Sequence, residues 1–203
     1  MSVQPGLPRD YFEELYRRRD DPWRFETRWY EERKRALTVA ALPRHRYLNV
    51  LELGCATGLL TGQLADRADA LLAIDISQGA VDLASARLVD RGHVRIERAD
   101  LRDGLPAGSF DLVVVSEVAY YLARDEVSAL ADGIRDRLAS SADVVLCHWR
   151  WPVEDYPLTG DEVHDILRSR LGLQRIGRLE EQDLLLEVLS TDERSVATRE
   201  GLR

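Results

Sequence analysis

The sequence lacks the features of several protein classes. No apolar run approaches the ~20 residues that a membrane-spanning helix needs, and the first residues, MSVQP, show no basic and then apolar signal-peptide pattern. Cysteine is scarce: Cys55 and Cys147 stand far apart without CxxC partners, which argues against a zinc site or a disulfide framework. We therefore expect a cytoplasmic protein without membrane contact, in which both cysteines are packing residues.

Basic residues are fewer than acidic ones. The chain has 28 Lys and Arg against 36 Asp and Glu, a formal net charge of −8. Its one basic cluster, Arg17 to Arg19, is followed at once by Asp20 and Asp21, which is typical of a solvated helix face. A nucleic-acid-binding surface needs a basic patch, so we expect no nucleic-acid partner.

Alternating apolar patterns predict an open α/β sheet. Two last strands, 173–178 and 183–189, have no helical stretch between them and predict a hairpin. The other strands are expected over 48–53, 70–74, 94–97, 110–116 and 142–147, and helices over 59–67, 78–89 with Ser77 as N-cap, 124–138 and 160–171. Such alternation predicts a doubly wound sheet that binds its ligand at the carboxyl ends of the strands.

The 203 residues are enough for one such domain with an appended segment at each end. We expect residues 1–42 to form an N-terminal helical cap, 43–190 the ligand-binding domain, and the polar segment 191–203 a disordered tail. The cap should hold helices over 11–19 and 28–41, and it carries seven of the fourteen aromatic residues. For Trp23, a lid over the ligand and packing on the core are equally supported.

A glycine loop joins the first strand of the domain to its first helix. In the segment LELGCATG, residues 51–58, Gly54 and Gly58 let the backbone turn tightly and approach a ligand closely. Asp75 ends the next strand, 21 residues after Gly54, a spacing suited to a carboxylate that accepts hydrogen bonds from two ribose hydroxyls. A dinucleotide site would have glycines where Ala56 and Leu59 stand, so a nicotinamide oxidoreductase ranks last among the alternatives.

The loop and the segments after it resemble class I S-adenosylmethionine (SAM)-dependent methyltransferases. The resemblance covers Val50 to about Leu189 and includes LLAIDIS at 71–77, RADL at 98–101 and FDLVVVSE at 110–117. It implies SAM as cofactor and a Rossmann-like seven-stranded sheet of order 3-2-1-4-5-7-6 with the last strand antiparallel. It also implies that Glu52 and Gly54 lie near the amino-acid end of SAM, Asp75 at the ribose and Asp100 at the adenine amine.

The candidate SAM-binding residues are Trp23, Glu52, Gly54, Cys55, Ala56, Gly58, Leu59, Asp75, Ile76, Ser77, Asp100, Leu101, Ser116 and Glu117. For Asp100 and Glu52 a purely structural role also stays open. Asp100 is also placed to cap a turn or helix, and Glu52 to cap the loop at its strand end.

A closer resemblance is carried by four short segments: DPW at 21–23, WYE at 29–31, SEVAYYL at 116–122 and HWR at 148–150. They look like the rhizobial nodulation-factor N-methyltransferases, the nodulation protein S family, over most of residues 11–190. That group methylates the free amine of a deacetylated glucosamine oligosaccharide. The resemblance therefore implies an amino sugar as the class of acceptor.

Residues after the fourth and fifth strands are the candidates for chemistry on the acceptor. Glu117 and His148 are each placed to orient or deprotonate an amine, although Glu117 is equally placed to cap a helix and His148 to pack. The candidate acceptor-binding residues are Tyr120, Tyr121, Trp149 and Trp151, for which sugar stacking and core packing both stay open. His164 falls in a predicted helix and is expected at the surface. No pair of carboxylates predicts a metal site.

The sequence thus predicts a SAM-dependent methyltransferase that acts on an amine of a small acceptor, with an amino sugar favoured. The alternatives are a natural-product O-methyltransferase and a non-catalytic SAM-binding module that regulates a partner. The oligomeric state is left open.

Overall fold

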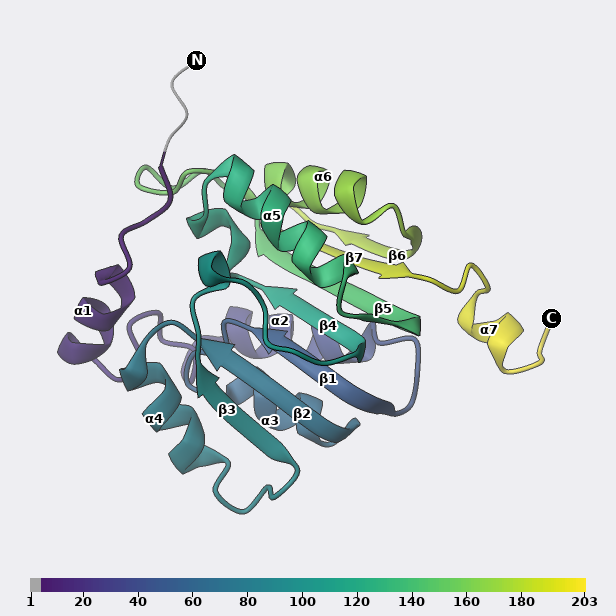
Figure 1. The fold of residues 1–203 in the computed structure, drawn as a ribbon, viewed down its shortest axis with the longest axis horizontal. Helices are drawn as coiled ribbons and strands as arrows, with labels where there is room; N and C mark the ends of the chain where they lie inside the picture. The colour runs from purple at the N-terminus through teal and green to yellow at the C-terminus, as the bar shows by residue number, and fades with distance from the viewer. Residues whose placement is uncertain (1–4) are drawn as a thin grey trace.

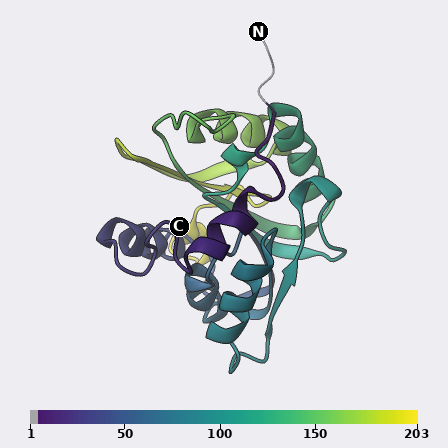
Figure 2. The same ribbon diagram turned by 90° about the vertical axis from the view of Figure 1, so that its left-hand side faces the viewer.

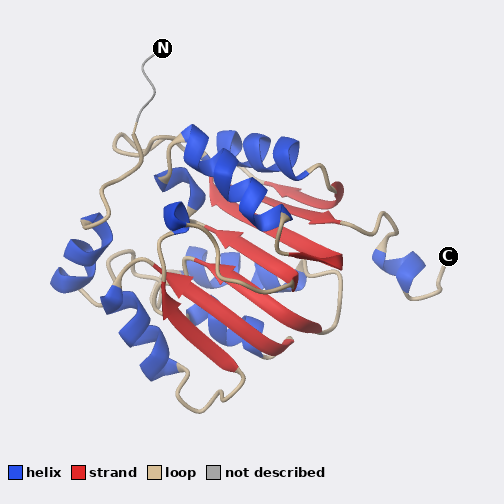
Figure 3. Cartoon of the chain, in the orientation of Figure 1, coloured by secondary structure: helices blue, strands red, loops and turns tan. Residues whose placement is uncertain are grey.

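The computed structural model describes residues 5–203. The first four residues of the predicted cap lie outside the described part, and most of the MSVQP segment lies there too. Seven strands form one sheet that is layered between helices (Figure 1, Figure 3). The strands are β1 (Tyr47–Leu53), β2 (Ala68–Asp75), β3 (Val94–Arg98), β4 (Phe110–Ser116), β5 (Leu138–Trp149), β6 (Gln174–Glu180) and β7 (Leu184–Ser190). The α-helices are α1 (Tyr11–Arg18), α2 (Trp29–Ala40), α3 (Leu59–Ala65), α4 (Gln78–Arg87), α5 (Arg124–Arg135), α6 (Gly160–Leu171) and α7 (Val196–Arg199).

The strand order is β3-β2-β1-β4-β5-β7-β6, as predicted. Strands β1 to β5 pair in parallel, whereas β7 is antiparallel to both of its neighbours, β5 and β6. The predicted hairpin between the last two strands is therefore confirmed, and so is the doubly wound α/β class. The parallel strands all end at the left-hand side of the sheet in Figure 1.

Alternating apolar residues build a core on each face of the sheet. Leu51 and Leu53 of β1 pack with apolar residues of α5 and α6 on one face, whereas Val50 packs with Leu64 of α3 on the other. In Figure 1 α5 and α6 lie in front of the sheet and α2 and α3 lie behind it. The central strands read as continuous apolar runs because both of their faces are covered.

Local caps explain why several predicted boundaries agree with the structure. Ser77 accepts a hydrogen bond from the backbone N–H of Ala80 and begins α4, as predicted. Thr159 and Glu162 form a capping box at the start of α6, and Gly172 ends that helix with φ +63°.

One prediction about an element end is wrong, and the C-terminal segment contains a helix that was not predicted. Leu138 was expected to close the fifth helix of the chain, but α5 ends at Arg135 and Leu138 begins β5, where it pairs with Phe110 of β4. The tail 191–203, expected to be disordered, contains α7. Arg199 in this helix lies 3.6 Å from the buried carboxylate of Asp143, and that long-range pairing is invisible in the sequence.

The N-terminal segment crosses the carboxyl ends of the parallel strands. Figure 2, which views the molecule from that side, shows α1 lying across the middle of the sheet end. Ser77 donates a hydrogen bond of 2.9 Å to Glu13 of α1, and the backbone N–H of Gln78 donates another of 2.9 Å to the same carboxylate. These bonds attach α1 to the start of α4. Among residues 5–203, no helix has both the length and the apolar character that crossing a membrane requires.

Candidate functional site

A cavity opens at the carboxyl ends of the first four strands, beneath the N-terminal segment. It offers about 1080 Å³ of free space, its open mouth included. The predicted site residues that line it are Trp23, Glu52, Gly54, Cys55, Ala56, Leu59, Asp75, Ile76, Asp100, Leu101, Ser116, Glu117 and Tyr121. Six others do not line it: Gly58, Ser77, Tyr120, His148, Trp149 and Trp151.

The glycine loop needs its glycines for steric reasons. Gly54 has φ +77°, and a Cβ there would lie 2.8 Å from the side chain of Val118. Gly58 has φ +79°, and a Cβ there would lie 3.0 Å from Ala84 of α4. Gly58 thus supports the cavity from behind by allowing close packing of the loop on α4. Ala56 also has a positive φ, +48°, which costs a non-glycine residue on the order of 1 kcal/mol.

The Asp75 carboxylate joins the loop to the second strand. It accepts a hydrogen bond of 2.9 Å from the backbone N–H of Ala56 and one of 3.0 Å from that of Ser77. Burial raises the pKa of Asp75, and these backbone hydrogen bonds offset only part of that rise. Two backbone N–H groups thus hold this carboxylate at the cavity wall.

Asp100 caps a short helix and also lines the cavity. Its carboxylate accepts a hydrogen bond from the backbone N–H of Arg102 and so caps the short 3₁₀ helix η1 (Leu101–Asp103), while the same residue lines the cavity. The guanidinium groups of Arg102 and Arg9 each lie 2.8 Å from it. Burial raises the pKa of Asp100, but these partners lower it by more, so the net shift is downward. Arg9, distant in sequence, carried no signal for this contact.

Glu117 stands at the end of β4 with both carboxylate oxygens occupied. The Tyr120 hydroxyl donates to Oε2 at 2.7 Å, and the backbone N–H of Trp149 donates to Oε1 at 2.7 Å. Its φ is +56°, an uncommon value for a residue other than glycine and one that occurs at functional sites. Tyr120, a candidate acceptor-binding residue, does not line this cavity, and its hydroxyl orients Glu117. Burial raises the pKa of Tyr120 well above its usual range, and the Glu117 charge raises it further.

A buried lysine from the cap completes this part of the site. The Lys34 ammonium lies 2.8 Å from Glu31 and 3.3 Å from Glu117, and only 4% of Lys34 is exposed. Burial lowers the pKa of Lys34, but the carboxylates of Glu117 and Glu31 raise it, and the net shift is upward. Sequence reasoning missed Lys34. A signal was present in the i, i+3 spacing of Glu31 and Lys34 on a helix, but nothing in it showed that this helix face is buried.

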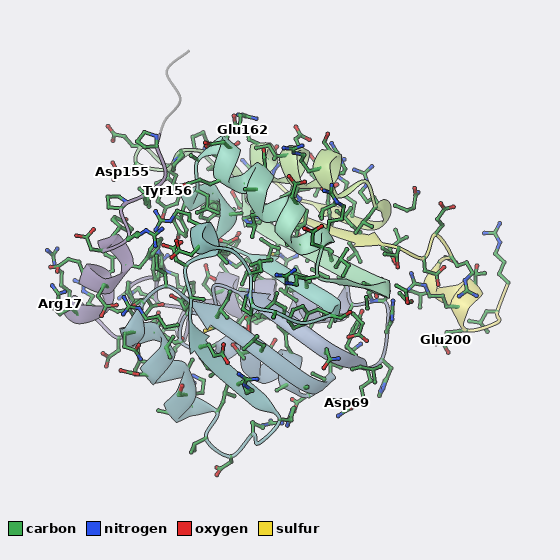
Figure 4. The ribbon with its side chains drawn as sticks, in the orientation of Figure 1. Arg17, Asp69, Asp155, Tyr156, Glu162 and Glu200 are labelled. Carbon is green, nitrogen blue, oxygen red and sulfur yellow. The ribbon has the colours of Figure 1, made fainter. Side chains whose placement is uncertain are left out.

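The predicted aromatic residues fall into two groups. Tyr121 lines the cavity, and its ring packs against those of Tyr120, Tyr156 and Phe12 at centroid distances of 4.7 to 4.8 Å. Figure 4 places Tyr156 at the upper left, on the side of the molecule where α1 lies.

The tryptophans after β5 lie away from the cavity. Trp149 packs edge-on against Tyr30 at 5.6 Å, while Trp151 is 48% exposed and donates a hydrogen bond of 2.5 Å to Asp183. These contacts favour packing for Trp149 and leave the ring of Trp151 accessible at the surface.

His148 is fully buried and does not reach the cavity. Its Nδ1 lies 3.1 Å from Nε2 of His164, whose Nδ1 lies 2.9 Å from Glu187. The prediction of a surface position for His164 is wrong, because only 1% of this residue is exposed. Burial lowers the pKa of His148 well below its usual range, and His164 and Lys34 lower it further. This geometry favours the packing alternative for His148.

An aromatic cluster from the cap closes one side of the cavity. The ring of Trp23 stacks on Phe25 at 5.4 Å and meets Tyr16 edge-on at 5.8 Å. The Asp21 carboxylate fixes this turn by accepting hydrogen bonds from the backbone N–H groups of Phe25 and Glu26. Trp23 therefore packs on its neighbours and lines the cavity at the same time.

Four buried polar atoms of the cavity lining have no hydrogen-bond partner within residues 5–203: Tyr16 Oη, Arg35 Nε, Glu52 Oε2 and Thr57 Oγ1. Buried polar groups without partners are rare and costly. Burial of Glu52, 2% exposed, raises the pKa of its carboxyl to about 8. A cavity with both donors and acceptors left free is suited to a polar ligand with several functional groups. The described residues include no group of three His, Cys, Asp or Glu side chains arranged to hold a metal ion.

Comparisons with known proteins show which family the sequence matches. The family model described as Nodulation protein S (NodS) matches residues 10–150. The Nodulation protein S of Sinorhizobium fredii is 32% identical over 124 residues, which cover 61% of this chain and 56% of that protein. The aligned part spans only about half of such curated relatives, 56% in this protein and 44% in the relative from Rhizobium tropici.

Solved structures extend the similarity over almost the whole chain. The N-methyltransferase NodS of Bradyrhizobium japonicum WM9 in complex with S-adenosyl-L-homocysteine superposes with a TM-score of 0.79 at 27% identity, covering 88% of this chain and 97% of that one. A Pseudomonas syringae protein described as a candidate methyltransferase is 45% identical with a TM-score of 0.72, covering 80% of this chain and 99% of that one.

Proposed function

The chain belongs to the nodulation protein S family, as its sequence predicted, and we propose that it transfers a methyl group from SAM to an amine of a small acceptor, with an amino sugar as the favoured class. SAM is the cofactor. The cavity suits it in chemical terms, because free polar atoms, the Asp75 carboxylate and the Asp100 carboxylate offer contacts to its amino-acid, ribose and adenine parts respectively.

When bound, SAM supplies a methyl group that is already activated on a sulfonium. The protein then has to hold donor and acceptor in line and to exclude water. In our proposal Asp75 accepts hydrogen bonds from the ribose, Asp100 lies at the adenine edge, and Glu52 and the backbone of Gly54 face the amino-acid end. The cap residues Trp23 and Phe25 exclude water from one side of the cavity.

One observation carries the choice of an amine. The cluster at the end of β4 combines the carboxylates of Glu31 and Glu117 with the single ammonium of Lys34, so it keeps one net negative charge beside the cavity. That charge attracts a protonated amine and stabilises the positive charge on its nitrogen. Within this cluster Glu117 has a fixed orientation, because its two carboxylate oxygens accept hydrogen bonds from the Tyr120 hydroxyl and the backbone N–H of Trp149.

A protonated amine has no lone pair, so it must lose one proton before its nitrogen attacks the methyl group and the bond from that group to the sulfonium breaks. We propose that Glu117 orients the amine and takes that proton. His148 is assigned no contact with the acceptor, because it is buried outside the cavity.

The test is methyl transfer to a glucosamine oligosaccharide with a free terminal amine, followed by mass spectrometry. The expected product is the N-methylated sugar, with no product from the N-acetylated counterpart. Glu117→Gln should lower turnover about 100- to 1000-fold while SAM affinity changes less than threefold (about the scatter of such titrations). Glu32→Gln is the matched control, because Glu32 is an exposed carboxylate of α2 that does not line the cavity.

Three results would redirect the proposal. Methylation of a hydroxyl acceptor instead of the amine would support the O-methyltransferase alternative. SAM binding without product from any acceptor would support the non-catalytic module. Normal turnover of Glu117→Gln, together with loss of turnover in His148→Ala at intact SAM affinity, would exchange the roles of these two residues.

The division into a cap over 1–42 and a SAM-binding domain over 43–190 is part of the same proposal, and so is a cytoplasmic location. The contacts of Glu13 with Ser77 and Gln78 support a cap that is attached to the domain.

A further inference from the structure

Lysine is almost absent from this chain. Lys34 is the only lysine among 28 basic residues, and all the others are arginine. It is 4% exposed and lines the cavity beside Glu117. An arginine presents a planar fork of donors, whereas a lysine ammonium is compact and carries three donors that point in different directions. The one lysine ammonium of the chain thus belongs to the candidate site.

The Lys34 ammonium uses two of its three donors within the protein. Its nitrogen lies 2.8 Å from a carboxylate oxygen of Glu31 and 3.3 Å from Oε2 of Glu117. The Tyr30 ring covers another side, with its centroid 5.2 Å from the nitrogen, and offers no oxygen there. Among residues 5–203 the ammonium makes no hydrogen bond to a third acceptor. One N–H of this buried cation is therefore left for a ligand in the cavity.

Glu117 has a free position that complements this donor. An ionised carboxylate accepts about four hydrogen bonds. The Tyr120 hydroxyl and the backbone N–H of Trp149 supply two of them, and Lys34 approaches a third position. Glu117 therefore keeps room for about one more donor, beside an ammonium whose nitrogen is 3.3 Å away.

A free acceptor beside a free donor matches an amine and a hydroxyl on neighbouring carbons. In a staggered arrangement the nitrogen and oxygen of such a ligand are about 3 Å apart. We propose that Lys34 donates a hydrogen bond to the hydroxyl next to the acceptor amine, while Glu117 binds the amine itself. The acceptor class is then a vicinal amino alcohol. The inference rests on the proposed function in one respect, that Glu117 binds the acceptor amine.

Lys34 thereby discriminates between amines that the charge cluster alone would treat alike. The net negative charge of the cluster attracts any protonated amine. Only an amine with a hydroxyl on the next carbon also pairs with the free N–H of Lys34. A site built to hydrogen-bond a hydroxyl rejects an analogue that lacks it, because the buried polar group of the site is then left unpaired.

The experiment compares two amines by titration into the protein saturated with S-adenosyl-L-homocysteine, which permits no methyl transfer. They are the methyl glycoside of glucosamine and its deoxy analogue, which lacks only the hydroxyl on the carbon next to the amine. The wild type should bind the glycoside about 10- to 100-fold more tightly than the analogue. In Lys34→Met this preference should fall below about threefold. Arg33→Met should keep it, because Arg33 lies on the same helix but does not line the cavity.

A second readout needs no variant. Protein grown with isotope-labelled lysine gives one side-chain ammonium signal in NMR spectra, because Lys34 is the only lysine. At saturation the glycoside should shift this signal further than the deoxy analogue does. Equal shifts would overturn the inference even where Lys34→Met does not fold.

Equal affinity of the wild type for the two amines would overturn the inference as well. So would an unchanged preference in Lys34→Met, or an equal loss of affinity for both amines, which would indicate a purely structural lysine. A protein that shows the expected preference but methylates no amine loses the proposed function and keeps this inference. One that methylates both amines and binds them equally keeps the proposed function and loses this inference.

Discussion

Replacing Lys34 with methionine tests whether the buried charge cluster is held together as the structure indicates. The substitution keeps the length and much of the volume of the side chain but removes its ammonium. Glu31 then loses the only ion-pair partner it has among residues 5–203, while Glu117 keeps hydrogen bonds from Tyr120 and Trp149. The cost should therefore arise mainly at Glu31.

The size of the effect follows from burial. Removing one partner of a buried ion pair costs about 3–5 kcal/mol of folding free energy. The retained hydrogen bonds of Glu117 place the expected loss near the lower end, at about 3 kcal/mol. For a chain of this length, such a loss lowers Tm by about 6–12 °C. Adding Glu31→Gln to Lys34→Met should restore about 1 kcal/mol or more, because the uncompensated charge is gone.

The assay is urea unfolding at pH 7 followed by tryptophan fluorescence. Arg33→Met is the matched control, since the ion pair of Arg33 with Glu181 is partly exposed to solvent. This variant should lose at most about 1 kcal/mol of folding free energy. If Lys34→Met lost no more than Arg33→Met, water or a rearranged helix would be compensating the cluster. The account of a buried, coupled site would then be wrong.

Two further variants probe the cofactor end of the cavity. The folded pKa of Glu52 is about 8 against an ordinary value of 4.5, so the folded state holds this proton more tightly than the unfolded state. The wild type without ligand should lose stability as the pH rises from about 4.5 to 8, by up to about 1.4 kcal/mol per pH unit. Glu52→Gln should lack this dependence, and parallel stability curves for the two proteins between pH 5.5 and 8.5 would contradict the assignment. Asp75→Asn should weaken SAM binding about 10- to 100-fold by titration, because it removes a charged acceptor. Asp69→Asn, an exposed residue at the lower right of Figure 4, should leave the affinity unchanged, and equal losses would remove the ribose-binding role of Asp75.

Much of the fold was open to prediction from the sequence because its determinants are local. The glycine loop requires positive φ at Gly54 and Gly58, and only glycine adopts such values without strain. Strand β4 is a continuous apolar run, and α6 carries its own cap at each end. The order of the sheet came from the family resemblance, and the pairing of the strands confirms it.

The errors arose where distant contacts decide the structure. Leu138 fits the helical periodicity of α5, yet pairing with Phe110 draws it into β5. The polar composition of 191–203 is typical of disorder, but Arg199 finds the buried Asp143 carboxylate. His164 has no sequence feature that distinguishes it from a surface residue, and its buried partner Glu187 lies on β7, far along the chain from α6.

By itself the sequence determined the glycine loop at 51–58 and the Asp75 carboxylate at the end of β2. Their spacing along the chain fixes how they lie in space. Only the tertiary structure decided the rest. It brought Lys34 of the cap to Glu117 of β4 and turned Tyr120 away from the cavity to orient that carboxylate. Periodicity and backbone geometry act over a few residues, whereas the match of buried charges depends on which elements the folded chain packs together.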